Sequence, residues 1–94
     1  MKKRSAYDIY ADVLKVVKAL GYASITKISY GAELPVDRAK KAVNVLLRAG
    51  LLEKRVKGGR VFYTVTGRGL EYLEIYFKLK EYLKNVEKST SNQY

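Results

Sequence analysis

The order of short apolar patterns between residues 24 and 65 constrains the fold of this chain more than any other feature. Apolar residues at helical spacing predict a short helix that begins after Ser24 and stops near Gly31, and a second helix over residues 35–49. Pro35 suits the first turn of the second helix, because its missing N–H would have no partner there. Two consecutive helices, each too short to be stable alone and joined by a tight turn, indicate a helix-turn-helix.

Two short β-type runs follow directly, over residues 51–56 and 60–65. In the second run, Phe62 and Thr64 alternate with residues of the opposite face, as a half-buried strand requires. Between the runs stands Lys57-Gly58-Gly59, and paired glycines strongly favour a tight hairpin turn. A hairpin placed directly after a helix-turn-helix is a wing.

A helix is expected at each end of this unit. Ser5 and Asp8 have the spacing of a capping box, and helical apolar spacing follows from residue 9 to residue 20. Thr66 can cap a final helix over residues 67–88, which leaves a polar tail over residues 89–94. Two glycines in its first turn, Gly67 and Gly69, are expected to allow close packing against the hairpin.

The predicted fold is therefore mainly α with a small β-hairpin, in the α+β class. Residues 1–66 would form a winged helix-turn-helix DNA-binding domain, and residues 67–88 a long C-terminal coiled-coil helix for dimerisation.

The residue types that are absent narrow the classes of function. The sequence holds no cysteine and no histidine, so it offers no disulfide, no Cys/His zinc site and no imidazole base. It also has no G-x-S-x-G nucleophile motif and no nucleotide-binding loop among its glycines. We therefore expect no enzyme, no cofactor and no metal. No apolar run approaches the roughly 18 residues of a membrane span, which indicates a cytoplasmic protein, and the composition is compatible with a thermophile.

The net charge of +10 is unevenly distributed along the chain. Residues 37–68 hold nine basic and two acidic side chains, a net +7, whereas residues 1–36 carry +3 and residues 69–94 carry no net charge. A polyanionic partner explains this asymmetry better than general solubility does.

The second helix of the pair carries the sharpest functional pattern. With its apolar stripe turned inward, Asp37, Lys41, Asn44 and Arg48 point to the opposite side, with Arg38 and Lys40 on the flanks. Arginine can pair with guanine and asparagine with adenine in a major groove, whereas flanking cations meet phosphates. The plainer interpretation is an ordinary solvated helix face.

The wing is the second candidate surface. Four cations surround its two-glycine tip: Lys54, Arg55, Lys57 and Arg60. Such a tip can follow a DNA backbone or enter a minor groove, although charge also protects an edge hairpin from aggregation. A basic arm at Lys2, Lys3 and Arg4 forms a third patch.

The final helix shows two apolar stripes. Leu70, Leu73 and Phe77 suit packing onto the winged core. The other stripe has the spacing of a heptad seam and comprises Tyr72, Ile75, Leu79, Tyr82 and Val86. A domain of this size needs only one apolar face of its terminal helix to complete its core. The second stripe therefore predicts packing against the same helix of another copy, in a homodimer whose helices could be parallel or antiparallel.

Three strings of residues carry a resemblance to a known family: Thr26-Lys27-Ile28-Ser29-Tyr30-Gly31-Ala32, Leu46-Leu47-Arg48-Ala49-Gly50-Leu51-Leu52 and Tyr63-Thr64-Val65-Thr66-Gly67-Arg68-Gly69. From about Ser5 to Val86 the chain resembles the small archaeal winged-helix proteins of the Sulfolobus ten-kilodalton DNA-binding class. The resemblance implies double-stranded DNA binding and a dimer held by an antiparallel coiled coil of the C-terminal helices. Tyrosines in the seam depart from the more aliphatic pattern of that class.

The leading hypothesis is a dimeric double-stranded-DNA-binding protein, either a transcription regulator or a chromatin-associated architectural protein. Helix 35–49 would lie in the major groove and wing 51–65 on the backbone or in the minor groove. The alternative is a winged-helix module for protein–protein interaction without intrinsic DNA binding. RNA binding through Tyr22, Tyr30 or Phe62 is a third option, but no RNA-module motif supports it.

Overall fold

The computed structural model describes residues 3–91 of the backbone and the side chains of residues 3–84. Its elements are α1 (Ala6–Leu20), α2 (Ile25–Gly31), α3 (Val36–Arg48), β1 (Leu52–Lys57), β2 (Arg60–Val65) and α4 (Gly67–Ser91). This order confirms the predicted winged helix-turn-helix. The last helix continues to Ser91, beyond the predicted end at residue 88, because neither glycine nor proline interrupts it after Gly69. None of the helices in the described range is both long and apolar enough to cross a bilayer.

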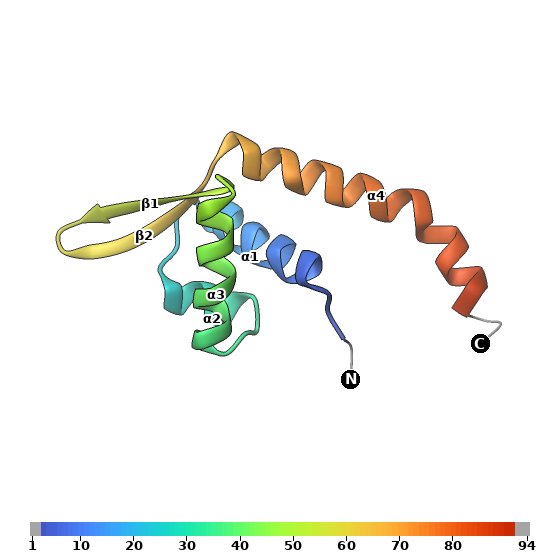
Figure 1. The fold of residues 1–94 in the computed structure, drawn as a ribbon, viewed down its shortest axis with the longest axis horizontal. Coiled ribbons are helices and arrows are strands. Elements are labelled where there is room, and N and C mark those ends of the chain that lie inside the picture. Colours follow the sequence, from blue (N-terminus) through green and yellow to red (C-terminus); the bar gives the residue numbers. More distant parts are fainter. Residues whose placement is uncertain (1–2, 92–94) are drawn as a thin grey trace.

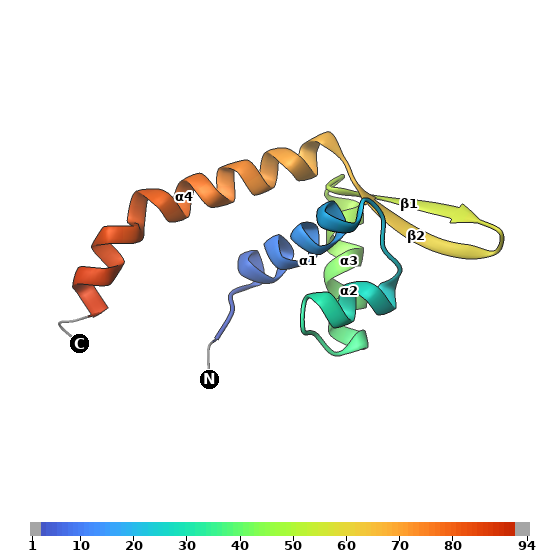
Figure 2. The same ribbon diagram turned by 180° about the vertical axis from the view of Figure 1, so that it is seen from behind.

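The first three helices form the body of the molecule around one apolar core. The hairpin projects from one side of this body, and α4 runs away from it on the other (Figures 1 and 2). The largest fully buried side chains are Val13, Leu14, Val17, Ile28, Val43 and Leu46. They come from all three helices, so the two short helices are stabilised by packing on each other and on α1.

The hairpin is a regular antiparallel pair. Its register runs from Leu52 opposite Val65 to Lys57 opposite Arg60, which leaves Gly58 and Gly59 as a two-residue turn. Both glycines have positive φ, at 56° and 77°, which is the backbone that a type I′ turn needs.

A single residue extends this sheet toward the helical body. Ala23 and Tyr63 exchange two backbone hydrogen bonds, of 3.0 and 2.9 Å, and so form an isolated antiparallel bridge. This bridge joins the base of the wing to the segment between α1 and α2.

The predicted helix caps are confirmed. Ser5 Oγ accepts a hydrogen bond from the Asp8 N–H at 3.1 Å, and the Asp8 carboxylate accepts one from the Ser5 N–H at 3.0 Å. Ser24 caps α2 through the Lys27 N–H at 3.3 Å. Thr66 Oγ1 accepts from the Gly69 N–H at 3.1 Å. These side chains satisfy backbone donors that a helix start leaves unpaired.

The close approach of α4 to the wing occurs at Gly69 and not at Gly67. A Cβ on Gly69 would lie 2.3 Å from the Leu51 carbonyl oxygen and 2.6 Å from Val65 Cγ1. A Cβ on Gly67 would meet nothing within 4 Å. The expectation of close packing is therefore confirmed at Gly69 and wrong at Gly67.

The face of α4 that packs on the body differs in part from the predicted stripe. Leu73 is buried as predicted, but Leu70 and Phe77 are 47% and 46% exposed, so that part of the prediction is wrong. Because Gly69 faces the hairpin, the residues four and seven positions later, Leu73 and Tyr76, also face the body. Leu70 is turned about 100° from Gly69, and Phe77 about 100° from Tyr76, so both lie at the edge of this face.

Two tyrosines attach α4 to α1. The Tyr72 hydroxyl donates to the Tyr7 carbonyl oxygen at 2.8 Å, and the Tyr76 hydroxyl donates to the Asp8 carboxylate. This hydrogen bond, together with those from Ser5, lowers the pKa of Asp8 from 3.8 to about 2. Burial and the hydrogen bond to Asp8 raise the pKa of Tyr76.

Candidate nucleic-acid interface

The outward stripe of α3 is exposed along its whole length. Asp37, Lys41, Asn44 and Arg48 lie opposite the buried side of the helix, which comprises Ala39, Ala42, Val43 and Leu46. The flanking Arg38 and Lys40 are exposed as well. The sequence-predicted contact residues on α3 therefore all point away from the core.

The turn before α3 is held in place from several directions. Leu34 is buried and its N–H donates to the Ser29 carbonyl oxygen at 2.9 Å. Glu33 has a positive φ of 54°, a conformation uncommon for a residue with a side chain. A Cβ on Gly31 would lie 2.8 Å from Val16 Cγ1, so α2 can approach α1 closely only because residue 31 is glycine.

Arg4 fixes the same turn from the N-terminal side. Its guanidinium forms an ion pair with Asp12 at 2.9 Å and donates to the Ala32 and Glu33 carbonyl oxygens at 2.7 and 3.0 Å. The prediction that Arg4 belongs to a basic arm for a partner is wrong, since these contacts engage it within the fold. Lys3 is exposed, and Lys2 lies outside the described residues.

The wing presents its cations around a tip that has no side chains. Lys57 and Arg60 are register partners on either side of the Gly58-Gly59 turn. Because side chains alternate along a strand, Lys54 lies on the face of Tyr63 and Arg55 on the face of Phe62. All four cations are exposed.

The cations of α3 and the wing are left largely unneutralised. Three ion pairs occur among the described residues: Arg4–Asp12, Lys15–Asp12 and Arg55–Glu53 at 3.1 Å. Within that range, no carboxylate therefore lies within 4 Å of the charged nitrogens of Arg38, Lys40, Lys41, Arg48, Lys54, Lys57 or Arg60. The result is a positive field on this side of the molecule.

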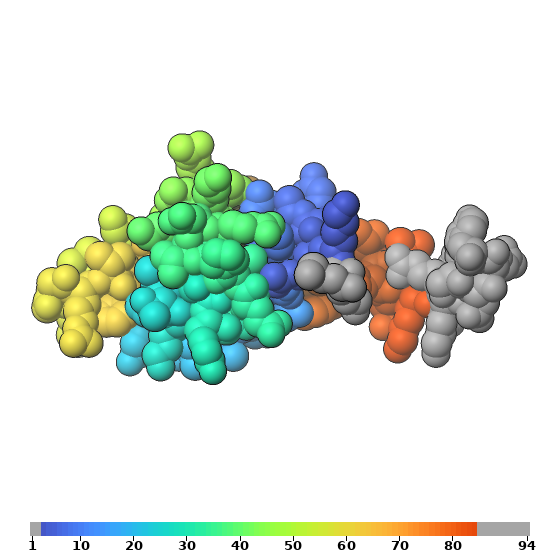
Figure 3. Space-filling model, turned by 90° about the horizontal axis from the view of Figure 1, so that it is seen from below, coloured from blue at the N-terminus to red at the C-terminus, as the bar shows by residue number. Residues whose placement is uncertain are grey.

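Helix α3 and the base of the wing form one continuous surface. Lys40 and Asn44 of α3 line a small groove with Tyr63 of β2 and Ile25 of α2. In Figure 3, seen from below, α2 and α3 in teal and green adjoin the yellow hairpin, while α1 and α4 lie to the other side. Lys40 and Asn44 of α3 are thus placed beside the base of the wing.

One cation on this side was not among the predicted contacts. Arg68, exposed at the start of α4, lies beside Gly50, because a Cβ on Gly50 would be 3.7 Å from its Cδ and Nε atoms. It therefore adds a charge near the C-terminal end of α3. The sequence could have indicated Arg68 as a contact residue, because it lies in the strongly basic segment of residues 37–68.

The predicted dimer seam is only partly free in the monomer. Ile75, Leu79 and Tyr82 are 59%, 56% and 71% exposed, whereas Tyr72 is half-buried against α1. The assignment of Tyr72 to an intermolecular seam is therefore corrected to an intramolecular packing role. The side chain of Val86 lies outside the described residues. Leu83, four residues after Leu79, is an exposed apolar side chain that the prediction missed.

Solved structures from bacteria and archaea share this fold. Sso10a-2, a DNA-binding protein from Sulfolobus solfataricus, matches with a TM-score of 0.77 and 25% identity over 96% of this chain and 96% of that chain. Sco5413, a MarR family transcriptional regulator from Streptomyces coelicolor, matches with a TM-score of 0.70 and 22% identity over 80% of this chain and 54% of that one. Lactococcus lactis ZitR in complex with DNA matches with a TM-score of 0.66 and 14% identity, over 99% and 63% of the two chains.

The comparison with protein-family models agrees with the fold described above. No protein with a curated description matches the chain. The family model described as winged helix-turn-helix matches residues 3–84, which include α1, α2, α3 and both strands of the wing. With the helix pair, the hairpin and this match in agreement, the chain belongs to the winged helix-turn-helix family.

Proposed function

We propose that this protein binds double-stranded DNA with α3 in the major groove and the wing on the backbone or in the minor groove. The observation that carries the proposal is the continuous surface of α3 and the wing, on which seven cations have no carboxylate partner in the described chain. A surface of this kind attracts a polyanion, and releasing counterions from DNA supplies most of the binding free energy.

The shape of this surface fits the grooves of B-DNA. A major groove is about 12 Å wide and admits one α-helix. Lys41, Asn44 and Arg48 stand on the exposed stripe, where Arg48 could pair with guanine and Asn44 with adenine. The bare glycine tip would let the wing backbone come close to DNA while Lys57 and Arg60 contact phosphates.

Related structures support the same assignment. Sso10a-2 is described as a DNA-binding protein, and ZitR has been solved with DNA. Either a transcription regulator or a chromatin-associated architectural protein is consistent with this surface. In both roles the protein would act on the nucleoid.

We also propose a homodimer joined through α4. The helix extends away from the body after Tyr76 (Figure 1). Ile75, just before this point, and Leu79, Tyr82 and Leu83 beyond it are exposed apolar side chains. A second copy of the same helix would cover this stripe by a two-fold interface. The dimer would then present two DNA-binding heads.

The test is binding to a random duplex and to a pool of genomic fragments over a salt series, with the mass of the protein measured in the same buffers. Uniform binding with a steep salt slope, about 0.9 per phosphate contact, would support the architectural role. Enrichment of a few fragments by roughly 10³-fold over the rest would support a regulator. No duplex binding at low salt would overturn the proposal and favour a protein-interaction module.

Two variants that each lose four positive charges test whether DNA binds at the proposed surface. Replacing Lys41, Arg48, Lys57 and Arg60 by glutamine should abolish most of the affinity and lower the salt slope by about 3 to 4. The control replaces four exposed lysines elsewhere by glutamine: Lys15, Lys18, Lys78 and Lys84. If both variants lose affinity equally, the net charge matters and the proposed surface does not.

A further inference from the structure

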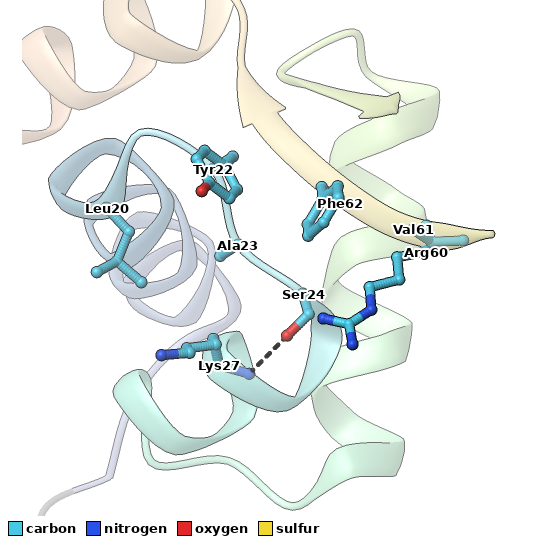
Figure 4. A pocket seen from close by; sticks show the side chains of 8 residues that line it. All are labelled: Leu20, Tyr22, Ala23, Ser24, Lys27, Arg60, Val61 and Phe62. Atoms are coloured by element: carbon cyan, nitrogen blue, oxygen red, sulfur yellow. Dashed lines mark hydrogen bonds between the residues drawn. The ribbon is translucent and has the colours of Figure 1, made fainter. Parts of the chain in front are cut away.

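A hollow on the outer side of the wing plays no part in the proposed groove contacts of α3. It lies between the end of α1, the start of α2 and β2, and has a volume of about 490 Å³ (Figure 4). Its lining comprises Leu20, Tyr22, Ala23, Ser24, Lys27, Arg60, Val61 and Phe62.

Aromatic side chains form the wall of this hollow. Tyr22 and Phe62 meet edge to face, with ring centroids 5.2 Å apart and planes at 80°. Tyr22 is 59% exposed, and Leu20 and Val61 of the same lining are also exposed. Apolar surface that is contiguous and open to water is a common mark of a binding site. A flat aromatic ring would find partners here on two differently oriented faces.

Positive charge surrounds this apolar wall. Arg60 extends from β2 toward Ser24, and Lys27 stands on α2 on the other side of the hollow (Figure 4). No lining residue carries a carboxylate, so both cations are available to an anion. The Ser24 hydroxyl oxygen accepts from the Lys27 N–H at 3.3 Å, and its own proton is free to donate.

We propose that this hollow binds a small aromatic carboxylate. Its ring would pack against Tyr22 and Phe62. Its carboxylate would accept hydrogen bonds from the Arg60 guanidinium and the Ser24 hydroxyl, while Lys27 adds positive charge from the other side of the hollow. Guanidinium groups bind carboxylates with two parallel hydrogen bonds, and the nearby apolar wall strengthens that contact by excluding water.

Occupancy of the hollow would bear on DNA binding through one shared residue. Arg60 also belongs to the proposed DNA-binding surface, so a bound carboxylate would withdraw one cation from the wing. This consequence depends on the proposed function, whereas the ligand site itself does not. A small aromatic anion would thus act as an effector that weakens binding to DNA.

The site is tested on the protein alone, without DNA, by following backbone amide NMR signals during titration with 2-naphthoate. Shifts should concentrate at residues 20–27 and 60–62. The neutral 2-naphthamide should bind about tenfold more weakly, because it loses the charge-assisted hydrogen bonds. Shifts centred elsewhere, or equal binding of the amide, would overturn the proposal.

Variants identify the groups that hold the carboxylate. Lys27→Gln and Arg60→Gln should each weaken 2-naphthoate binding by about fivefold or more. Lys54→Gln, on the other face of the same hairpin, should leave it unchanged. Equal losses in all three variants would show a general charge effect and overturn the site. A short single-stranded oligonucleotide that shifts the same amides at lower concentration would instead make the hollow a nucleobase site.

The link to DNA is tested separately. Saturating 2-naphthoate should weaken duplex binding of the unmodified protein about threefold or more, and should have no effect on the Arg60→Gln variant. A ligand that binds in the NMR titration but leaves duplex affinity unchanged would overturn the effector role alone. Failure of duplex binding itself would overturn the proposed function and leave the NMR result standing.

Discussion

Replacing Gly69 by alanine tests the close contact between α4 and the wing. The added methyl group would lie 2.3 Å from the Leu51 carbonyl oxygen and 2.6 Å from Val65 Cγ1. Overpacking of this kind typically costs about 1–3 kcal/mol, and a backbone carbonyl cannot relieve it by rotating, so we expect a cost of about 3 kcal/mol. Alanine also gains up to about 1 kcal/mol of helix propensity over glycine. The expected net loss of stability is therefore about 2 kcal/mol.

The measurement is the free energy of unfolding in urea, at fixed protein concentration because dimerisation would make stability depend on it. Gly67→Ala is the matched control: a Cβ there meets nothing within 4 Å, so its stability should stay unchanged or rise by up to about 1 kcal/mol. If Gly69→Ala proves as stable as the unmodified protein, the reasoning about steric contact at this position is refuted. Equal destabilisation of both variants would attribute the loss to the helix start in general.

Three further predictions follow from contacts at the two ends of the body. Arg4→Met should lower stability by about 1–2 kcal/mol in urea unfolding, because it removes one ion pair and two hydrogen bonds to the turn; an unchanged midpoint would contradict this. The double variant Ile75→Gln with Leu79→Gln should shift the solution mass from dimer to monomer without loss of helix signal, whereas Lys78→Gln with Glu81→Gln should remain dimeric; a monomeric unmodified protein would refute the proposed interface. The carboxylate of Asp8, with its pKa lowered from 3.8 to about 2, stabilises the fold fully above about pH 4, and this contribution is lost progressively as the pH falls through about 2. Asp8 is half-buried and water screens its charge, so Asp8→Asn should cost about 1 kcal/mol at pH 6 and less at pH 2, where about half of the Asp8 carboxyl groups are protonated. An equal cost at both pH values would argue against the charge as the cause.

Local signals were sufficient to predict the secondary structure. The caps at Ser5, Ser24 and Thr66 each depend on residues three positions apart, and the paired glycines specify the hairpin turn by their backbone freedom. The outward face of α3 followed from helical periodicity, because its buried positions are consistently apolar.

Contacts between distant segments could not be predicted in the same way. Which stripe of α4 faces the body depends on where Gly69 meets Leu51, and both candidate stripes were apolar enough to pack. Tyr72 was misassigned because tyrosine is equally suited to an interface and to a half-buried site where its hydroxyl finds a carbonyl. Arg4 was assigned to a charged N-terminal arm because nothing in the local sequence indicates its hydrogen-bond acceptors. These acceptors are the backbone carbonyls of residues 28 and 29 positions further along the chain.

The departure of α4 from the body after Tyr76 also affects the spacing of the two DNA sites that a dimer could bind at once. In a dimer joined through α4, one residue inserted between the body and the contact stripe would turn each head by about 100° and shift it by about 1.5 Å. An insertion of seven residues, about two turns, would nearly restore the original facing and move the head outward by about 10 Å, or about three base pairs of DNA. The phase and spacing of two half-sites could therefore change through insertions in one linking helix, while every residue of the proposed DNA-binding surface stayed the same.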